Sequence, residues 1–197
     1  MATQSIWLAR FFSFAAALLS IEAAAAANEY TIDPALTTVS FEVKRLGISR
    51  QSGEFSSVVG TVALDAEAGE GAIEITVDTR SIHASSETAE NFLRGPSVLN
   101  VEQYGQIAYK AEHVVFMGGK PGRIEGTLTL LGVTRPVSLT VVGYTCPHST
   151  ATGQQRCTLD ATAFFKRSDF GMTRYLAIVS DEVKLDIHGV AGHPVSE

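Results

Sequence analysis

Apolar and polar residues alternate along much of this chain. The clearest example is the stretch GTLTLLGVTRPVSLTV, residues 126–141, in which leucine or valine repeatedly alternates with threonine or serine. A period of two places the apolar side chains on one face of a β-strand. Gly132 and Pro136 bracket the break between the two halves, so the stretch predicts an antiparallel hairpin.

The same kind of alternation predicts eight strands, separated by turn signals such as GGKPG at 118–122. One segment, 86–94, instead predicts a helix, because Ser86 can cap its first turn and two glutamates suit the positive end of the helix dipole. A second short helix is predicted at 172–177. The predicted strands are 39–44, 55–65, 72–78, 107–116, 123–131, 137–144, 157–166 and 182–188.

Eight mostly antiparallel strands predict an all-β domain with one or two short helices. The pattern is compatible with both a sandwich and a closed barrel. Small residues share inward faces with aliphatic ones, and they either leave an apolar void or face large side chains across a packed core. The pattern favours neither alternative. These small residues are Ala111, Gly126, Ala161 and Ala163.

The N-terminal segment predicts a cleaved signal peptide, residues 1–27. Arg10 precedes an apolar run at 11–21, and the alanine tract ending at Ala27 supplies the small residues that a signal peptidase reads. The remaining domain, 28–197, is expected to be secreted into the periplasm. Its net charge stays at the −6 of the whole chain, because the segment carries one charge of each sign. Without clustered lysine and arginine, nucleic acid is not expected as a partner.

Two cysteines, Cys146 and Cys157, flank a polar, turn-forming stretch. In an oxidising compartment an even pair is most simply a disulfide, and closing so short a loop contributes about 3 kcal/mol through chain entropy. Two unpaired buried thiols are the alternative interpretation.

Motifs of familiar enzyme chemistry are absent from the sequence. It contains no HExxH, CxxC, GxSxG or GxxxxGK[ST], and no two histidines stand at the spacing of paired metal ligands. The sequence therefore predicts neither a metal site nor a cofactor. His113 shares the inward parity of Tyr109 and is a candidate polar group inside the barrel, with a hydrogen-bonded structural role as the alternative.

Several collinear stretches carry a family resemblance. They are YTIDPALTTVSFEVKRLGI from Tyr30, GEFSSVVGTVALD, FLRGPSVLNVEQYGQIAY, the hairpin at 126–141, and FFKRSDFGM with SDEVKLDI. Together they resemble the YceI family of periplasmic, lipocalin-like proteins, a subset of which has a similar cysteine pair. The chain departs from the family pattern at Leu36 and Arg45, where many members carry histidine, and at 97–99. These departures bear on the head group of a ligand more than on the fold.

The resemblance implies an eight-stranded antiparallel, lipocalin-like barrel that holds a long polyisoprenoid lipid, such as a prenyl chain or a quinone tail. It implies a binding protein for carriage or sequestration, with no established catalysis. Transient membrane contact and a homodimer are further expectations. Arg94 and His113 are candidates for head-group contacts. The residues expected to contact the lipid are Phe41, Val43, Phe55, Ile75, Val77, Phe92, Leu93, Leu99, Ile107, Tyr109, Leu128, Leu130, Leu139, Val141, Ala163, Phe165 and Phe170.

Two other functions stay open at this point. One is an enzyme acting on such a lipid, which requires its candidate groups His113, Arg94 and Asp169 to converge at one end of the barrel. The other is a packed, ligand-free barrel that acts through its surface on a membrane redox protein. A continuous internal void of several hundred Å³ would count against that second function.

Overall fold

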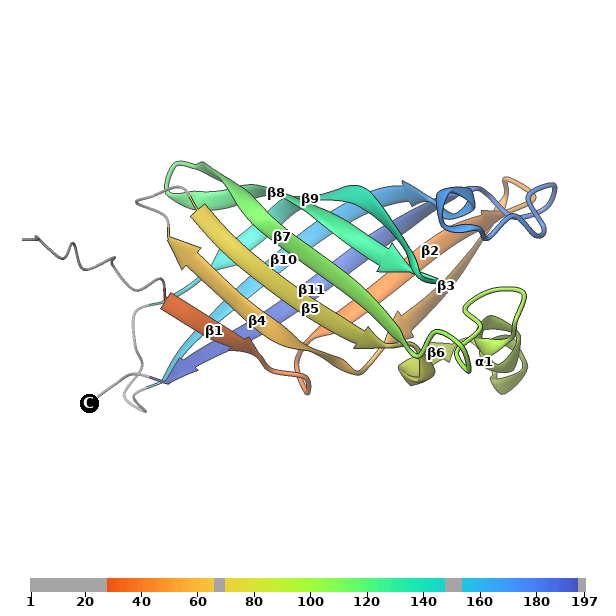
Figure 1. Cartoon of the computed structure of the whole chain (residues 1–197), viewed down its shortest axis with the longest axis horizontal. Coiled ribbons are helices and arrows are strands. Elements are labelled where there is room, and N and C mark those ends of the chain that lie inside the picture. The colour runs from red at the N-terminus through yellow and green to blue at the C-terminus, as the bar shows by residue number, and fades with distance from the viewer. Residues whose placement is uncertain (1–27, 66–69, 148–153, 195–197) are drawn as a thin grey trace, which may run out of the picture.

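The computed structural model describes residues 28–65, 70–147 and 154–194, which form one antiparallel sheet of eleven strands (Figure 1). In the same residues lie one α-helix, α1 (Glu87–Arg94), and two 3-10 helices, η1 (Thr79–Ser81) and η2 (Arg167–Phe170). The strands are β1 (Asn28–Ile32), β2 (Thr38–Arg45), β3 (Ser49–Phe55), β4 (Val58–Asp65), β5 (Glu70–Asp78), β6 (Ile82–Ala84), β7 (Gln106–Met117), β8 (Lys120–Leu130), β9 (Val133–Thr145), β10 (Gln154–Lys166) and β11 (Glu182–Pro194).

The sheet closes on itself into a barrel of eight strands. Neighbours around the ring are β1, β4, β5, β7, β8, β9, β10 and β11. β1 completes the ring by pairing with β11, where Thr31 lies opposite Gly192. Closure leaves no open sheet edge along these strands, so the structure confirms the predicted barrel and excludes the sandwich.

Three positions of the ring are each occupied by two strands in succession. β1 and β2 both pair with β11. Next to them, β4 pairs with β1 and β3 with β2, and in the third position β5 pairs with β4 and β6 with β3. The strand predicted at 55–65 is therefore two strands, interrupted at 56–57. The alternation does not predict β1, β3 or β6, because β1 and β6 are short and β3 (SRQSGEF) carries a single large apolar side chain.

The helix predicted at 86–94 is confirmed as α1. The hydroxyl oxygen of Ser86 accepts a hydrogen bond from the amide of Ala89 at 3.2 Å, and two glutamates lie in the first turn. The helix predicted at 172–177 is wrong, because residues 172–173 have no regular structure and residues 174–177 form turns. A short helix precedes them instead: η2 is capped by Gly171, whose φ of 86° is a conformation that glycine adopts readily.

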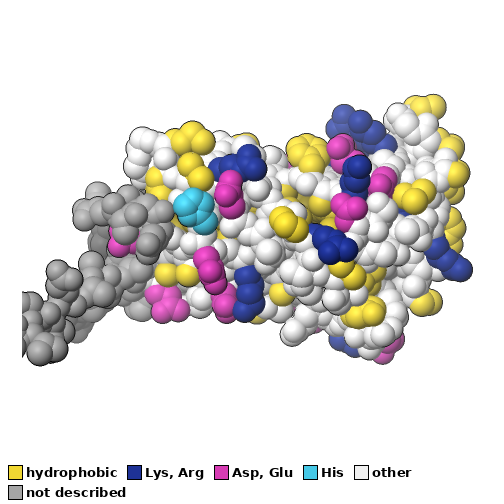
Figure 2. All heavy atoms as spheres, turned by 45° about the horizontal axis from the view of Figure 1, so that its top comes forward, with side chains coloured by type: hydrophobic (Ala, Val, Ile, Leu, Met, Phe, Trp, Pro, Cys, Tyr) yellow, Lys and Arg dark blue, Asp and Glu magenta, His cyan; other side chains and the backbone are white. Residues whose placement is uncertain are grey.

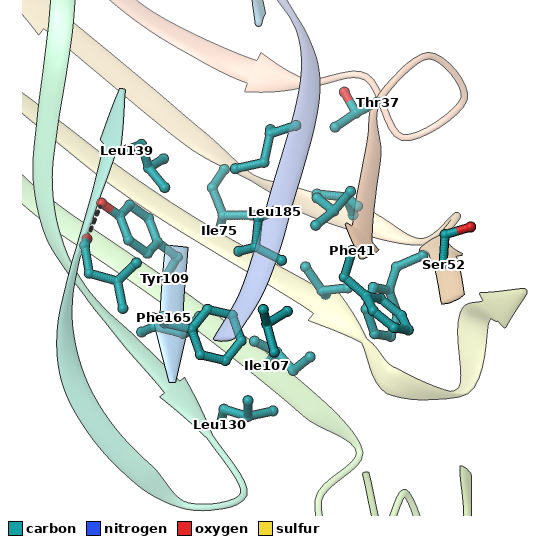
Figure 3. Close-up of a pocket in the computed structure, with 18 of the residues that line it drawn as sticks. Thr37, Phe41, Ser52, Ile75, Ile107, Tyr109, Leu130, Leu139, Phe165 and Leu185 are labelled. Atoms are coloured by element: carbon teal, nitrogen blue, oxygen red, sulfur yellow. Dashed lines mark hydrogen bonds between the residues drawn. The ribbon is translucent and has the colours of Figure 1, made fainter. Parts of the chain in front are cut away.

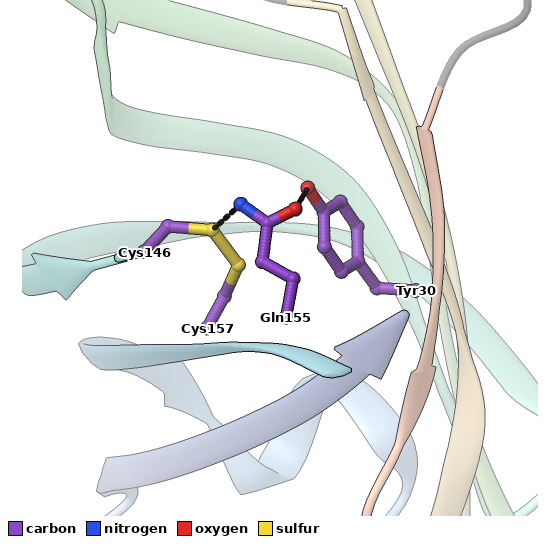
Figure 4. Close-up of a disulfide and its surroundings, with 4 residues drawn as sticks. All are labelled: Tyr30, Cys146, Gln155 and Cys157. Carbon is purple, nitrogen blue, oxygen red and sulfur yellow. Dashed lines mark hydrogen bonds between the residues drawn. A yellow bond between two sulfur atoms is a disulfide. The ribbon is translucent and has the colours of Figure 1, made fainter. Parts of the chain in front are cut away.

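The two ends of the barrel differ. At one end, on the right of Figure 1, lie α1, the β2–β3 turn and the segment after η2. Near the other end Cys146 and Cys157 form a disulfide between the end of β9 and β10, as predicted (Figure 4). Gln155 donates a hydrogen bond to the Cys146 sulfur and accepts one from the Tyr30 hydroxyl, each at 3.4 Å. We call these the α1 end and the disulfide end.

The predicted signal peptide, residues 1–27, lies outside the described residues. Among the helices of the described part of the chain, none has the length and apolar character to cross a membrane.

Candidate functional site

A cavity of about 550 Å³ runs through the barrel interior. It extends from Tyr30 and Tyr144 near the disulfide end to Phe92 and Tyr175 at the α1 end, and most of its wall is aliphatic or aromatic. Pockets for small molecules measure roughly 300–1,000 Å³. β10 has 13 residues, about 40 Å along the strand and about 30 Å along a barrel axis to which strands tilt by about 40°. The bore is therefore long and narrow.

The wall is assembled from inward-facing positions on strands all around the barrel. Figure 3 shows Phe41 of β2, Ile75 of β5, Ile107 of β7, Leu139 of β9 and Leu185 of β11 turned toward the cavity. Because side chains alternate between the two faces of a strand, each strand gives every second residue to this wall. The result is a surface suited to an apolar chain and poor in groups that could hydrogen-bond a polar ligand.

Two glycines make room for large rings in this wall. A Cβ at Gly126 would lie 2.6 Å from the ring of Tyr109, and a Cβ at Gly53 would lie 2.7 Å from the ring of Phe41. Real Cβ atoms essentially never make non-bonded contacts this short. Glycine at these two positions therefore allows the rings to lie against the backbone of the barrel.

The small inward residues noted in the sequence do not create the cavity. Ala111, Gly126, Ala161 and Ala163 are not among the residues that line it, and the three alanines are buried. The ring that Gly126 accommodates belongs to Tyr109 of the neighbouring strand β7, and not to a residue across the barrel as the packed-core alternative expects. The void lies among the larger aliphatic residues instead.

The hydroxyl of Tyr109 is a polar group held within this apolar wall. It lies 3.0 Å from the carbonyl oxygen of Val137, to which it donates, and 3.4 Å from that of Ile124 (Figure 3). Burial raises the pKa of Tyr109, and the carboxylate of Glu125 raises it further. The phenol is therefore neutral at physiological pH, and the protein backbone satisfies its hydroxyl.

The cavity opens at the α1 end. Phe92 of α1 and Tyr175 of the segment after η2 meet across this end, with ring centroids 5.7 Å apart. At the disulfide end, the lining residues Tyr30 and Cys157 are buried. Among the described lining residues, those that are exposed all belong to the α1 end: Arg45, Gln51, Ser52, Ser85, Phe92, Tyr175 and Ile178.

A buried arginine fastens the segment 171–180 at this mouth. The guanidinium of Arg167 donates hydrogen bonds of 2.7–3.1 Å to the carbonyl oxygens of Met172, Arg174, Val179 and Ser180. Burial lowers the pKa of Arg167, and the carboxylate of Asp181 opposes that effect. Since an arginine stays protonated in proteins, the guanidinium remains a charged donor here.

Asp181 completes this arrangement. Its carboxylate accepts hydrogen bonds from the amide and the hydroxyl of Ser168, at 2.9 and 2.8 Å. Burial raises the pKa of Asp181, but these hydrogen bonds and the nearby cations Arg167 and Lys166 outweigh it, so the pKa lies below its ordinary value. Asp181 is therefore ionised under physiological conditions and ties η2 to the start of β11.

Comparison with known proteins assigns the chain to a family. Residues 30–191 match the YceI-like domain. The chain belongs to the YceI family. A UPF0312 protein of Shewanella baltica strain OS195 is 29% identical over 185 residues, which cover 90% of this chain and 94% of the relative. A UPF0312 protein of strain OS185 is 31% identical over 172 residues, covering 83% and 87%.

Solved structures share the YceI barrel. BcnA of Burkholderia cenocepacia matches with a TM-score of 0.68 and 25% identity, over 81% of this chain and 98% of BcnA. A polyisoprenoid binding domain from Saccharophagus degradans matches with a TM-score of 0.62 over 84% of this chain and 98% of that domain. At 15% identity, this second likeness concerns the fold alone.

Most residues that the YceI resemblance and the alternation nominate for lipid contact do line the cavity. Val141, Ala163 and Phe170 do not. Ala163 and Phe170 are buried, Phe170 packs edge-on against Phe165 at 5.2 Å, and Val141 is partly buried against the core. Lipid contact itself stays a prediction. The lining residues are Phe41, Val43, Phe55, Ile75, Val77, Phe92, Leu93, Leu99, Ile107, Tyr109, Leu128, Leu130, Leu139 and Phe165.

The two residues nominated for head-group contact do not line the cavity. The predicted inward orientation of His113 is wrong: a register shift in β7 between Ala111 and His113 reverses the alternation, and His113 is exposed. Arg94 is directed to the neighbouring backbone, donating to the carbonyl oxygen of Ile82 at 2.8 Å and pairing with Glu90 at 3.1 Å.

Arg45 and Arg167 are the arginines of the cavity wall. Arg45 stands where many YceI members carry histidine, whereas Leu36, the other position at which many members carry histidine, is exposed outside the wall. A buried arginine such as Arg167 leaves no periodic signal, and only the stretch FFKRSDFGM marks it. The apolar lining residues that the lipid-contact prediction omits include Ile32, Val39, Val58, Val62, Leu64, Ile73, Ile124, Val137, Leu159, Val183, Leu185 and Ile187.

The groups proposed for an enzyme do not converge on the cavity. His113 and Asp169 are exposed, Arg94 binds β6, and none of the three lines the wall. Within the described residues, no group of three or more histidine, cysteine or acidic side chains is placed to hold a metal ion.

Proposed function

We propose that the protein is a periplasmic binding protein that holds a long polyisoprenoid chain, of a prenyl lipid or a quinone, in its apolar bore. The observation that carries this proposal is the long, narrow cavity of about 550 Å³. A branched hydrocarbon chain needs apolar walls and length, and it needs no hydrogen bonds. A domain described as polyisoprenoid binding shares this fold, which is compatible with the same ligand class.

The energetics favour carriage or sequestration over permanent storage. Each buried methylene is worth about 0.8 kcal/mol relative to water, so a tail of dozens of carbons would exceed the practical affinity ceiling of roughly −20 kcal/mol. The relevant competitor is the lipid bilayer, where the tail is already dehydrated. Exchange between membrane and bore is therefore close to balanced, and cargo can move in either direction.

The polar head group of such a ligand belongs at the α1 end. Arg45, Gln51 and Ser52 are exposed lining residues there, whereas the wall deeper in the barrel is apolar. A charged or hydrogen-bonding head group buried deeper would lose its water without gaining partners. Arg45 replaces Arg94 and His113 as the candidate for head-group contact.

The packed-barrel alternative expects no continuous void, and the cavity counts against it.

Periplasmic location rests on the signal peptide predicted at 1–27, and homodimer formation stays a prediction. If the signal peptide is cleaved as predicted, protein recovered from the periplasm should have the intact mass of a chain that begins at Asn28.

Uptake of a defined ligand tests the proposal. Leu185→Trp adds bulk to the bore, whereas Lys184→Trp places the same side chain on the outer face of β11 and removes an exposed ion pair with Asp186. Wild type and Lys184→Trp should take up a long-chain polyprenol from detergent, and Leu185→Trp should take up about tenfold less, as overpacking of about 1–3 kcal/mol implies. Native mass spectrometry measures the bound fraction. Equal uptake by all three proteins, or none by wild type, contradicts the proposal.

A further inference from the structure

Exposed apolar side chains surround the mouth of the barrel. Two segments carry most of them, residues 44–50 at the β2–β3 turn and residues 171–180 after η2, and we call these two segments the rim. Ile48 is 90% exposed and Leu46 is 63% exposed. The exposed large apolar residues around the mouth are Leu46, Ile48, Phe92, Tyr175, Leu176 and Ile178.

The two segments of the rim form one continuous surface. The amide of Leu46 donates to the carbonyl oxygen of Ile178 at 2.7 Å, and the amide of Ser180 donates to that of Lys44 at 2.8 Å. Figure 1 shows both segments beyond the strand ends at the α1 end, and Figure 2 shows hydrophobic side chains with Lys or Arg among them at the same end. Five of the six apolar residues around the mouth therefore lie on neighbouring turns.

The rim is positively charged in a protein that is acidic overall. KRLGISR and GMTRYLAIVS contain four basic residues and no acidic residue, against a net charge of −6 for the whole chain. Arg50 forms an ion pair with Glu42 at 3.5 Å, and Arg174 donates a hydrogen bond to the hydroxyl of Ser97. The basic residues are Lys44, Arg45, Arg50 and Arg174.

We propose that the rim docks on the surface of an anionic lipid bilayer, with the mouth of the cavity against the membrane. Apolar side chains enter the boundary between head groups and acyl chains, and basic side chains meet the lipid phosphates, a combination typical of interfacial membrane binding. This docking deepens the proposed function, since it lets an isoprenoid chain pass between bilayer and bore without crossing water.

The opposite end offers a matched comparison. Met117 is the last residue of β7, near the disulfide end, and is 63% exposed, the same fraction as Leu46. Because the side chains of Ile48 and Met117 are mostly exposed, polar substitutions at either should leave the barrel folded. A difference between the two variants therefore reports on the rim rather than on exposed apolar surface in general.

Flotation of vesicles with the exported protein measures docking. Wild type should float with vesicles of phosphatidylcholine and phosphatidylglycerol and much less with phosphatidylcholine alone. Ile48→Asp should lower the partition coefficient by about tenfold, because a fully inserted aliphatic side chain is worth about 1.5–3 kcal/mol. Met117→Asp should bind as wild type does, and Lys44→Glu should weaken the preference for the anionic vesicles. Equal losses in Ile48→Asp and Met117→Asp, or no preference for anionic vesicles, would overturn the proposal.

A fluorescence measurement locates the contact. Trp7 is the only tryptophan of the sequence, so a cleaved chain that begins at Asn28 contains none. With anionic vesicles, Ile48→Trp should give a blue-shifted emission that brominated lipid quenches, whereas Met117→Trp should give neither change. Quenching of both reporters alike, or of neither, would contradict docking through the rim.

Docking and ligand binding fail separately in these experiments. The vesicles contain no isoprenoid, so their binding does not depend on cargo. Loss of docking with polyprenol uptake intact would reject the rim and leave the proposed function standing. Docking without polyprenol uptake would reject the proposed function and leave docking through the rim standing.

Discussion

At the residue scale, the wall of the bore depends on close contacts between glycines and aromatic rings. Gly126 lies against Tyr109, and a Cβ there would also lie 2.5 Å from the carbonyl oxygen of Lys110. The backbone of Lys110 cannot move aside as a flexible side chain can. The close packing of Gly126 against the ring therefore holds Tyr109 in place. The ring in turn keeps its hydroxyl on the carbonyl oxygen of Val137.

Replacement of Gly126 tests this contact. Gly126→Ala should destabilise the protein by about 1–3 kcal/mol, the usual cost of overpacking. Gly122→Ala on the same strand is the control, because the three atoms nearest to a Cβ there all belong to the flexible side chain of Met117. Urea unfolding measures both, and equal effects of the two substitutions would refute the role given to Gly126.

The buried phenol of Tyr109 predicts a loss of stability in alkali. Its folded pKa is raised, so its contribution is fully present below the unfolded pKa of about 10 and is lost as the pH rises through the folded pKa. Tyr144 and Lys110 also have raised pKa values and act in the same direction. Tyr109→Phe should therefore make the decline in unfolding free energy above about pH 10 less steep. Identical slopes for wild type and Tyr109→Phe would show that the phenol ionises as freely in the folded state.

At the element scale, the strands around the bore differ in how well sequence predicts them. β7 alternates clearly as far as Ala111, and the register shift before His113 then reverses the pattern without any change in composition. The interruption at 56–57 also leaves no signal in the sequence pattern, because apolar residues stand on both sides of it. Alternation is a property of neighbouring residues, whereas bulges and breaks depend on the partner strand.

The segment 171–180 is the element whose position depends most on one side chain. Arg167→Met removes the donors to four carbonyl oxygens, and we expect a loss of about 2–4 kcal/mol and faster hydrogen exchange at 172–180. Arg135→Met is the control, since exposed Arg135 makes one hydrogen bond, to the carbonyl oxygen of Asp169. Unchanged exchange at 172–180 in Arg167→Met would show that other contacts hold the mouth.

At the scale of the whole molecule, sequence indicates which side chains face inward but not whether opposite walls meet. Residues such as Phe41 and Leu139 are placed correctly because inward parity follows from local alternation. The cavity and its mouth depend on distances across the barrel, and the small residues expected to report on them line neither. Arg45 is visible in the sequence only as a departure from the family pattern.

The central claim is that the hollow barrel carries an isoprenoid chain, and the mass of its natural cargo tests this most directly. The protein should be purified from its own cells without detergent, weighed by native mass spectrometry and then extracted with organic solvent. We expect a bound species whose fragments differ by isoprene units and which leaves the protein on extraction. A native spectrum at the mass of the bare chain, together with an empty extract, would contradict the account.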